Sequence, residues 1–176
     1  MGLSKIVAQI HVRVISDSRS IGWLQCGTQF YPCLLGRSGK SFRKREGDGK
    51  SPKGSFKFVY SFYRSERLKC PSPAFAFRTT SPSSGWCDDV RSWRYNKMVK
   101  LPFAGSHESF TRNDNAYDIV LTTSHNQKPR IRGFGSAIFL HLIRSGSSGT
   151  DGCIALKREN LLKVLSRIGQ STTLII

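Results

Sequence analysis

The sequence lacks a long apolar run. Its most apolar stretch, residues 137–143, is far shorter than the roughly 20 residues that a membrane-spanning helix needs. Internal repeats, heptads and low-complexity tracts are also missing, which excludes coiled coils and repeat arrays. No two cysteines have the CxxC spacing of zinc ribbons, and no cluster of His, Cys or Asp has metal-ligand spacing, so we expect no metal site.

Acidic side chains are scarce. The chain has 11 Asp and Glu against 28 Lys and Arg, and its formal net charge is +17. Such basicity is typical of proteins that bind nucleic acid. However, residues 1–88 hold 15 basic and 5 acidic side chains, and residues 89–176 hold 13 and 6, so no basic tail stands out. The densest basic stretch, residues 37–57, is broken by glycines and is typical of a loop rather than a recognition helix.

Hydrophobic residues make up 38% of the 176 residues, which is enough for a packed core and excludes a disordered chain. This length is typical of one domain. The first ten residues do not resemble a secretory signal, because Lys5 is followed by only a few apolar residues before Gln9. The chain has five cysteines, namely Cys26, Cys33, Cys70, Cys87 and Cys153. Because this number is odd, at least one of them stays unpaired in any disulfide scheme.

Strand-like patterns run along most of the chain. The expected strands are residues 5–15, 22–26, 29–35, 55–63, 74–78, 117–123, 135–143 and 172–176. Gly27 and Thr28 predict a two-residue turn in which Cys26 pairs with Gln29. Cys33 then lies too far from Cys26 for a disulfide. Residues 85–102 show no clear period.

One helix is expected from Lys157. Its apolar positions follow helical spacing and are Leu161, Val164, Leu165 and Ile168. Gly169 stands where the glycine just beyond a helix end belongs. Short strands, Gly/Pro-rich turns and one C-terminal helix indicate a mainly β sandwich or barrel with long irregular loops. We expect one domain over residues 1–176, whose first 35 residues form N-terminal strands.

The most informative segment for chemistry runs from His141 to Cys153. His141 ends an apolar strand, and a Gly/Ser-rich loop returns to Gly152 and Cys153 just before the helix. A helix dipole can favour the thiolate of such a cysteine, and a nearby histidine can take the thiol proton. Gly152 leaves room for a substrate carbonyl near N–H donors that stabilise an oxyanion. The spacing alone fits an inert Cys153 and a buried, backbone-bonded His141 equally well.

The same segment resembles a known signature. His141, a loop and Thr150-Asp151-Gly152-Cys153 are similar to the histidine, loop and Ser/Thr-His-Gly-Cys of YkuD-type L,D-transpeptidases. Residues 47–56 resemble the family's Asp-Gly-x-Thr-Pro-x-Gly-x-Phe segment. Stretches that resemble a short, single-domain bacterial branch of the family are Gly85-Trp-Cys-Asp-Asp89, Tyr95-Asn96, Ser106-His107-Glu108, Tyr117-Asp118 and Gly133-x-Gly135-Ser-Ala-Ile-Phe-Leu-His141. The resemblance covers residues 36–169.

The resemblance implies a β-rich catalytic domain that acts on peptidoglycan stem tetrapeptides. It implies that Cys153 is the nucleophile, that His141 activates it, and that Gly152 and Cys153 form the oxyanion hole. The expected reaction releases D-Ala and passes the acyl group from a thioester to an amine. That amine belongs to another stem, giving a 3→3 cross-link, or to an envelope protein. Because the thioester conserves the peptide-bond energy, no cofactor is expected.

Two departures from the family pattern concern the acceptor. Asp151 replaces the histidine before Gly-Cys, and Ala155 replaces the usual Asn or Arg two residues after the cysteine. Asp151 can hold a substrate ammonium or orient a neighbour, and as a carboxylate it can also raise the thiol pKa. Other candidate substrate contacts are Thr150, Ser136, His107 and Trp86. Trp86 with Asp88 and Asp89 can wall the site and bind substrate ammonium groups. The ordinary alternative for these three residues is a Trp that plugs one end of the sandwich and Asp residues that cap turns.

The leading hypothesis is therefore a monomeric cysteine L,D-transpeptidase of the periplasm or cell envelope, with no nucleic-acid partner. An L,D-carboxypeptidase, in which water resolves the same acyl-enzyme, is the alternative within catalysis. A non-catalytic basic module that binds nucleic acid or an anionic wall polymer is the alternative from another class. The lack of a phosphate-tracking helix and of RNA-type aromatic motifs counts against that module.

Overall fold

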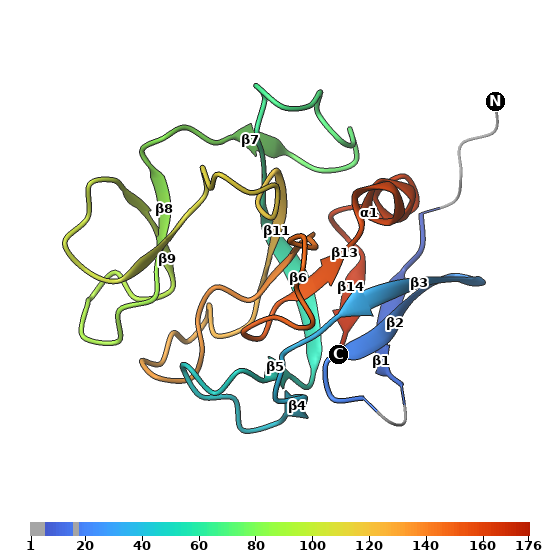
Figure 1. The fold of residues 1–176 in the computed structure, drawn as a ribbon, viewed down its shortest axis with the longest axis horizontal. Coiled ribbons are helices and arrows are strands. Elements are labelled where there is room, and N and C mark those ends of the chain that lie inside the picture. The colour runs from blue at the N-terminus through green and yellow to red at the C-terminus, as the bar shows by residue number, and fades with distance from the viewer. Residues whose placement is uncertain (1–5, 16–17) are drawn as a thin grey trace.

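Short strands dominate residues 6–15 and 18–176, the part of the chain that the computed structural model describes (Figure 1). In chain order the strands are β1 (Gln9–Val14), β2 (Ile21–Cys26), β3 (Gln29–Leu34), β4 (Lys40–Ser41), β5 (Ser51–Pro52), β6 (Ser55–Tyr63), β7 (Phe77–Thr79), β8 (Ser84–Cys87), β9 (Lys97–Lys100), β10 (His107–Ser109), β11 (Ile119–Thr123), β12 (Phe139–Leu142), β13 (Ile154–Leu156) and β14 (Thr173–Ile175). The helix is α1 (Arg158–Leu165). Lys5, the start of the first expected strand, lies outside the described residues.

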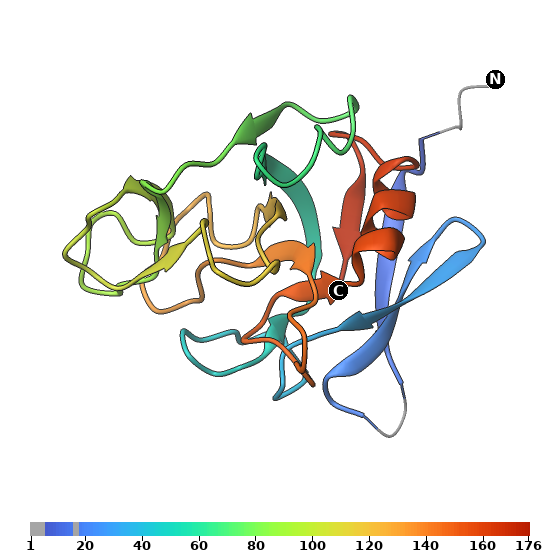
Figure 2. The ribbon, with the colours of Figure 1, turned by 45° about the horizontal axis from the view of Figure 1, so that its top comes forward.

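The largest sheet closes on itself. Its strand order is β11-β12-β13-β3-β2-β1-β14-β6-β7, and β6 also pairs with β11. This second pairing turns the sheet into a barrel, which removes most of its open edge. A separate sheet of β10, β8 and β9 lies on the side of the barrel away from β1–β3 (Figures 1 and 2). The mainly β, barrel-like fold expected from the sequence is confirmed.

Local sequence explains the hairpin and the longest strand. Gly27 has φ +61°, a conformation that glycine adopts at little cost, and the β2–β3 register pairs Cys26 with Gln29 as predicted. Gly22 pairs with Cys33, so the two cysteines stand at different rungs of the ladder. The alternating aromatic residues of 55–63 form β6 over the expected range.

Three expectations about element boundaries were wrong. The strand expected over 135–143 is shorter, because Gly135 and Ala137 have φ of +92° and +50° and bend the chain before β12. The hairpin of β8 and β9 was missed, since four-residue strands are too short to show a period. The helix ends at Leu165 with Ser166 as its C-cap, so Gly169 is not the glycine beyond its end.

Two apolar clusters fill the interior. The larger one lies within the barrel and includes Leu161, Val164 and Leu165 of α1, so the helix packs its apolar face against the barrel core. The smaller one joins Trp86 of β8 and Phe139 of β12 to Cys153. The contact between the barrel and the small sheet therefore runs directly beside Cys153.

Candidate active site

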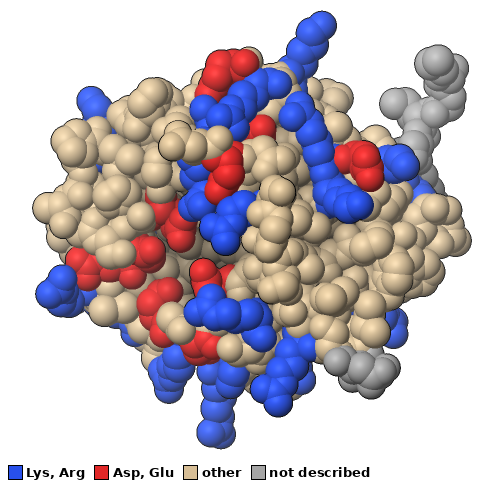
Figure 3. All heavy atoms as spheres, in the orientation of Figure 1, with Lys and Arg blue, Asp and Glu red and all other residues tan. Residues whose placement is uncertain are grey.

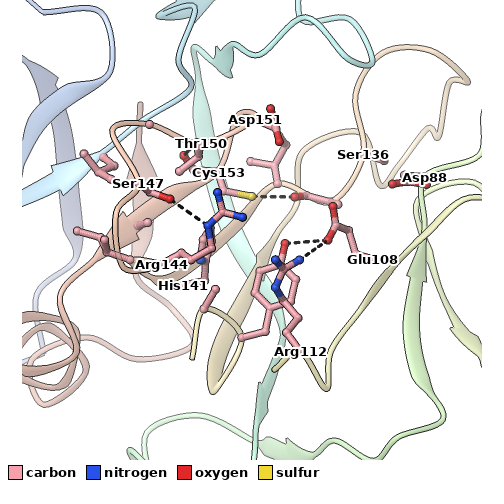
Figure 4. Close-up of a pocket in the computed structure, with 18 of the residues that line it drawn as sticks. Asp88, Glu108, Arg112, Ser136, His141, Arg144, Ser147, Thr150, Asp151 and Cys153 are labelled. Atoms are coloured by element: carbon pink, nitrogen blue, oxygen red, sulfur yellow. Dashed lines mark hydrogen bonds and ion pairs between the residues drawn. The ribbon is translucent and has the colours of Figure 1, made fainter. Parts of the chain in front are cut away.

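A cavity of about 180 Å³ lies where the small sheet meets β12 and the loop before β13. It brings together five residues singled out from the sequence, namely Cys153, His141, Ser136, Thr150 and Asp151. It also contains Asp88, considered from the sequence as a substrate contact, and charged residues with no role assigned from the sequence, namely Glu46, Glu108, Arg112 and Arg144 (Figure 4). Trp86, His107 and Gly152 are not among its lining residues.

Cys153 precedes β13, and its side chain is almost fully buried. The thiol donates to the Ala137 carbonyl oxygen at 3.0 Å and accepts a hydrogen bond from the Phe139 N–H at 3.3 Å. Burial raises the pKa of the Cys153 thiol to about 12, and the nearby Glu108 carboxylate acts in the same direction. The expected thiolate stabilisation by a helix dipole is absent, because β13 separates Cys153 from α1.

The strand register places His141 next to Cys153. His141 of β12 lies opposite Ala155 of β13 in a parallel pair. Residues two apart on an extended chain face the same side, so Cys153 and Ala155 face the cavity together with His141. This adjacency explains how two residues twelve positions apart in sequence come to share one cavity.

The His141 imidazole is held by a backbone carbonyl and an aromatic ring. Its Nδ1 lies 2.8 Å from the Leu142 carbonyl oxygen, and the Tyr117 ring packs edge-on at 5.2 Å between centroids. Burial lowers the pKa of His141 to about 4. A neutral imidazole next to a carbonyl carries its proton on Nδ1, which leaves Nε2 as the basic nitrogen.

The loop before Cys153 is fixed by one threonine. Thr150 Oγ1 donates to the Cys153 carbonyl oxygen at 2.7 Å and accepts from the Gly152 N–H at 3.1 Å. Gly152 has φ +137°, and a Cβ there would lie 2.7 Å from the Lys50 carbonyl oxygen. Glycine is therefore required at this position by both conformation and space.

Asp151 points away from the cavity interior. Its carboxylate pairs with the Arg37 guanidinium, and its side chain is 79% exposed. Figure 4 shows it directed outward beside Cys153. The rise in the thiol pKa that the Asp151 charge could cause, considered from the sequence, is therefore small, since exposed charges are well screened.

The small sheet presents Glu108 rather than His107 to the cavity. Successive residues of a strand face opposite sides, so only one of these two neighbours in β10 can line it. His107 Nδ1 instead lies 2.8 Å from the Gly105 carbonyl oxygen. Trp86 is 1% exposed and donates from Nε1 to Asn96 Oδ1, so it belongs to the core beside the cavity rather than to its wall.

Glu108 is a half-buried acid of the cavity, and it has two partners. The Tyr117 hydroxyl donates to Glu108 Oε2 at 3.2 Å, and Arg112 lies 3.5 Å from the same oxygen. Burial raises the pKa of Glu108, Arg112 opposes this shift, and Asp88 adds to it. Arg112 is also held by Asp114 at 3.0 Å. Both Glu108 and Tyr117 lie in stretches of family resemblance, which is the signal that could have pointed to them.

A comparison with protein-family models decides the identity of this arrangement. The model of the YkuD L,D-transpeptidase catalytic domain matches residues 11–176. The chain belongs to the YkuD family. The matched region starts well before residue 36, where the recognised motifs begin, and takes in strands β1–β3. Membership implies L,D-transpeptidase chemistry on peptidoglycan.

No curated protein and no solved structure matches the chain. No helix of the described residues is long and apolar enough to cross a membrane. Within the same residues, no group of three or more His, Cys, Asp or Glu side chains is arranged to hold a metal ion. The functional groups that line the cavity are a thiol, an imidazole, carboxylates and guanidinium groups.

Proposed function

We propose that this YkuD-family protein is a cysteine L,D-transpeptidase of the cell envelope, with Cys153 as nucleophile and His141 as general base. The observation that carries the proposal is the convergence of these two side chains on one cavity within a domain of that family. Peptidoglycan stem tetrapeptides are the proposed acyl donors.

In the acylation step, the Cys153 sulfur attacks the carbonyl carbon between the diamino acid and D-Ala. The thiol proton moves to Nε2 of His141, and the imidazolium then gives it to the departing D-Ala nitrogen. The carbon–nitrogen bond breaks, a thioester forms and D-Ala leaves as the free amino acid. His141 returns to its neutral state, so the step is balanced in protons.

The resting pair is neutral. With a Cys153 pKa of about 12 and a His141 pKa of about 4, an imidazolium–thiolate pair is strongly disfavoured before substrate binds. The thiol also donates to the Ala137 carbonyl in this state. Attack therefore requires the S–H to turn from Ala137 to Nε2 of His141, so proton transfer accompanies formation of the carbon–sulfur bond.

The oxyanion that forms on the attacked carbonyl lies near the N–H groups of Gly152 and Cys153 in this proposal. In the resting structure the Gly152 N–H donates to Thr150 Oγ1. The Gly152 N–H can donate to the oxyanion only when its hydrogen bond to Thr150 is shared or broken. Such preorganised donors typically contribute about 3–4 kcal/mol each to transition-state stabilisation.

The second half-reaction transfers the acyl group from sulfur to an amine of another stem or of an envelope protein. Its nitrogen attacks the thioester, loses a proton to neutral His141, and the Cys153 sulfur leaves and is reprotonated. With water in place of the amine, the same steps yield a shortened, uncrosslinked stem.

Mass analysis of muropeptides tests the proposal. Wild-type protein is expected to release D-Ala and form cross-linked dimers, whereas tripeptide stems alone would identify water as the acceptor. Cys153→Ala and His141→Gln should lower D-Ala release by about 10³-fold or more. Cys70→Ala, which removes an exposed cysteine outside the cavity, is the matched control. A Cys153→Ala protein that processes stems as well as wild type would overturn the proposal.

The basic-module alternative makes a different prediction. Binding to DNA or to an anionic wall polymer would fall steeply with salt and survive simultaneous substitution of His141 and Cys153. A protein with such binding and without D-Ala release would support that alternative instead.

A further inference from the structure

Acidic side chains are concentrated around the cavity. The whole chain has 11 of them, and four line this cavity, namely Glu46, Asp88, Glu108 and Asp151. In Figure 3, Asp and Glu side chains gather around the hollow in the face shown, while many Lys and Arg side chains extend at its edge. In a protein with a net charge of +17, this is a local reversal of sign.

Three of the four carboxylates have protein partners. Asp151 pairs with Arg37 outside the cavity, and Glu46 accepts a hydrogen bond from the Tyr95 hydroxyl. The carboxylates of Asp151 and Glu46 therefore already interact with other side chains of the protein. Glu108 uses Oε2 for Tyr117 and Arg112, and Asp88 Oδ1 is buried without a hydrogen-bond partner among the described residues.

The small sheet sets Asp88 and Glu108 side by side. Glu108 of β10 pairs with Trp86 of β8, and the Asp88 N–H donates to the Ser106 carbonyl at 3.2 Å, continuing the same ladder. Asp88 lies two residues after Trp86, so Asp88 and Glu108 occupy one face of the sheet as diagonal neighbours. Figure 4 shows both with Ser136 on the side of the cavity away from Arg144.

Among Asp88, Glu108 and Ser136, two side-chain oxygens are buried without a hydrogen-bond partner among the described residues. They are Asp88 Oδ1 and Ser136 Oγ, and Ser136 is only 6% exposed. Tyr95 is a polar neighbour of Ser136, and because its hydroxyl proton goes to Glu46, its oxygen can only accept from Ser136, which leaves the acceptor side of Ser136 Oγ unused. Glu108 Oε2 accepts one hydrogen bond, from Tyr117, and forms an ion pair with Arg112, and no hydrogen bond to Oε1 is formed within the same residues.

Unpartnered buried oxygens are costly, and the great majority in folded proteins are hydrogen-bonded. Here the unused groups are acceptors, they are clustered, and two of them are carboxylates. A group that satisfies them must bring several donors and positive charge. A primary ammonium has three N–H donors and one charge, which matches Asp88, Glu108 and the Ser136 hydroxyl.

From this cluster we propose that Asp88, Glu108 and Ser136 form a subsite for the side-chain ammonium of the diamino acid in the acyl donor. The proposal rests on the proposed function, because it assigns part of the substrate to the cavity of Cys153. It names a specificity determinant: the protein selects donors whose diamino acid has a free amine.

The chemistry favours the donor's amine over the attacking amine of the acceptor. Two carboxylates stabilise an ammonium and raise its pKa, which removes the lone pair that nucleophilic attack needs. An acceptor amine bound there would be held in its unreactive form. The side-chain amine of the donor takes no part in bond making, so tight binding as a cation does not slow the reaction.

The experiment compares three synthetic stem tetrapeptides with wild type and variants. The first carries diaminopimelate with its side-chain amine free, the second is acetylated at that amine, and the third has 2-aminopimelate in its place, which keeps the side-chain carboxylate and lacks the amine. For wild type, kcat/KM for D-Ala release should fall by about tenfold or more for the second and third stems, as expected for losing a charged hydrogen-bonded contact. In the variant Asp88→Asn with Glu108→Gln, this discrimination should fall to about threefold or less.

Asp89→Asn is the matched control, because Asp89 adjoins Asp88 but bonds to Arg91 and is absent from the cavity lining. It should keep the wild-type discrimination. A carbapenem, whose strained β-lactam carbonyl acylates a reactive thiol, serves as the common probe. Its adduct with Cys153, followed as an intact-mass shift, shows that each variant retains a folded reactive site. A purely structural role for the two acids would lower activity on all three stems equally and leave the ratio unchanged.

Equal wild-type rates on the free and acetylated stems would overturn the subsite while leaving the proposed function in place. So would a double variant that keeps full discrimination. A wild-type protein that neither releases D-Ala from any stem nor forms a carbapenem adduct would overturn the proposed function, and the subsite with it.

Discussion

At the scale of single residues, burial controls the reactive pair. Cys153 and His141 are both buried, and burial moves their pKa values apart, toward a neutral thiol and a neutral imidazole. A cysteine protease-like ion pair would need the opposite arrangement. The proposed chemistry therefore depends on substrate binding to redirect the thiol proton, and free enzyme should be poorly reactive toward simple alkylating agents.

Alkylation with iodoacetamide tests this resting state. At pH 8, Cys153 should react at least about tenfold more slowly than the exposed Cys70, because a thiol with a pKa near 12 is almost entirely protonated there. The Cys153 rate should rise about tenfold for each pH unit up to the limit of folding. Peptide mass spectrometry measures both sites in one sample. Faster reaction at Cys153 than at Cys70 would show a preformed thiolate and contradict the neutral pair.

At the scale of elements, the loop that ends at Cys153 depends on Thr150 and Gly152. Thr150 Oγ1 bonds at both sides of the loop, and Gly152 passes close to the Lys50 carbonyl with a positive φ. Adjacent strands β12 and β13 then hold His141 and Cys153 at neighbouring positions. The position of the Cys153 thiol is thus set by the loop of Thr150 and Gly152 and by the pairing of β12 with β13.

Gly152→Ala tests the contribution of the turn. Its Cβ would meet the Lys50 carbonyl oxygen at 2.7 Å, so we expect a loss of roughly 1–3 kcal/mol in the free energy of unfolding and a displaced Cys153. Urea denaturation and the rate of carbapenem acylation measure these effects. Gly146→Ala is the control, since Gly146 also has positive φ but no atom lies within 4 Å of its added Cβ. Equal losses in both variants would rule out the steric explanation.

At the scale of the whole molecule, the last strand joins the N-terminal strands of the barrel to β6. β14 lies between β1 and β6, and Leu174 is fully buried in the main core. The barrel in turn supports β12, which carries His141, and β13, which Cys153 directly precedes. Global stability and site geometry are therefore linked through β14.

Leu174→Ala should lower the free energy of unfolding by roughly 2–5 kcal/mol, the usual range for a buried leucine truncated to alanine. Phe42→Ala, at a side chain that is 81% exposed, should cost under about 1 kcal/mol. Urea denaturation followed by fluorescence compares the two variants. A Leu174→Ala protein as stable as the Phe42→Ala protein would show that β14 is not part of the cooperative core.

Local patterns in the sequence were sufficient for several elements. Alternating aromatic residues predicted β6, Gly27-Thr28 predicted the β2–β3 register, and helical spacing predicted the start of α1. These features depend on residues close together in the chain. The His141–Cys153 pair was reached through a resemblance of motifs, because spacing alone left an inert pair equally acceptable.

The sequence by itself determined that the chain is mainly β, has one helix and carries the motifs of the YkuD family. Only the tertiary structure decided which neighbours of those motifs face the cavity. The pleat of β10 turns Glu108 inward instead of His107, and burial raises the pKa of the Cys153 thiol where a helix dipole was expected to favour the thiolate. The reason is physical: side-chain direction and desolvation depend on strand pairing and packing between distant segments, and these contacts leave no periodic trace in the sequence.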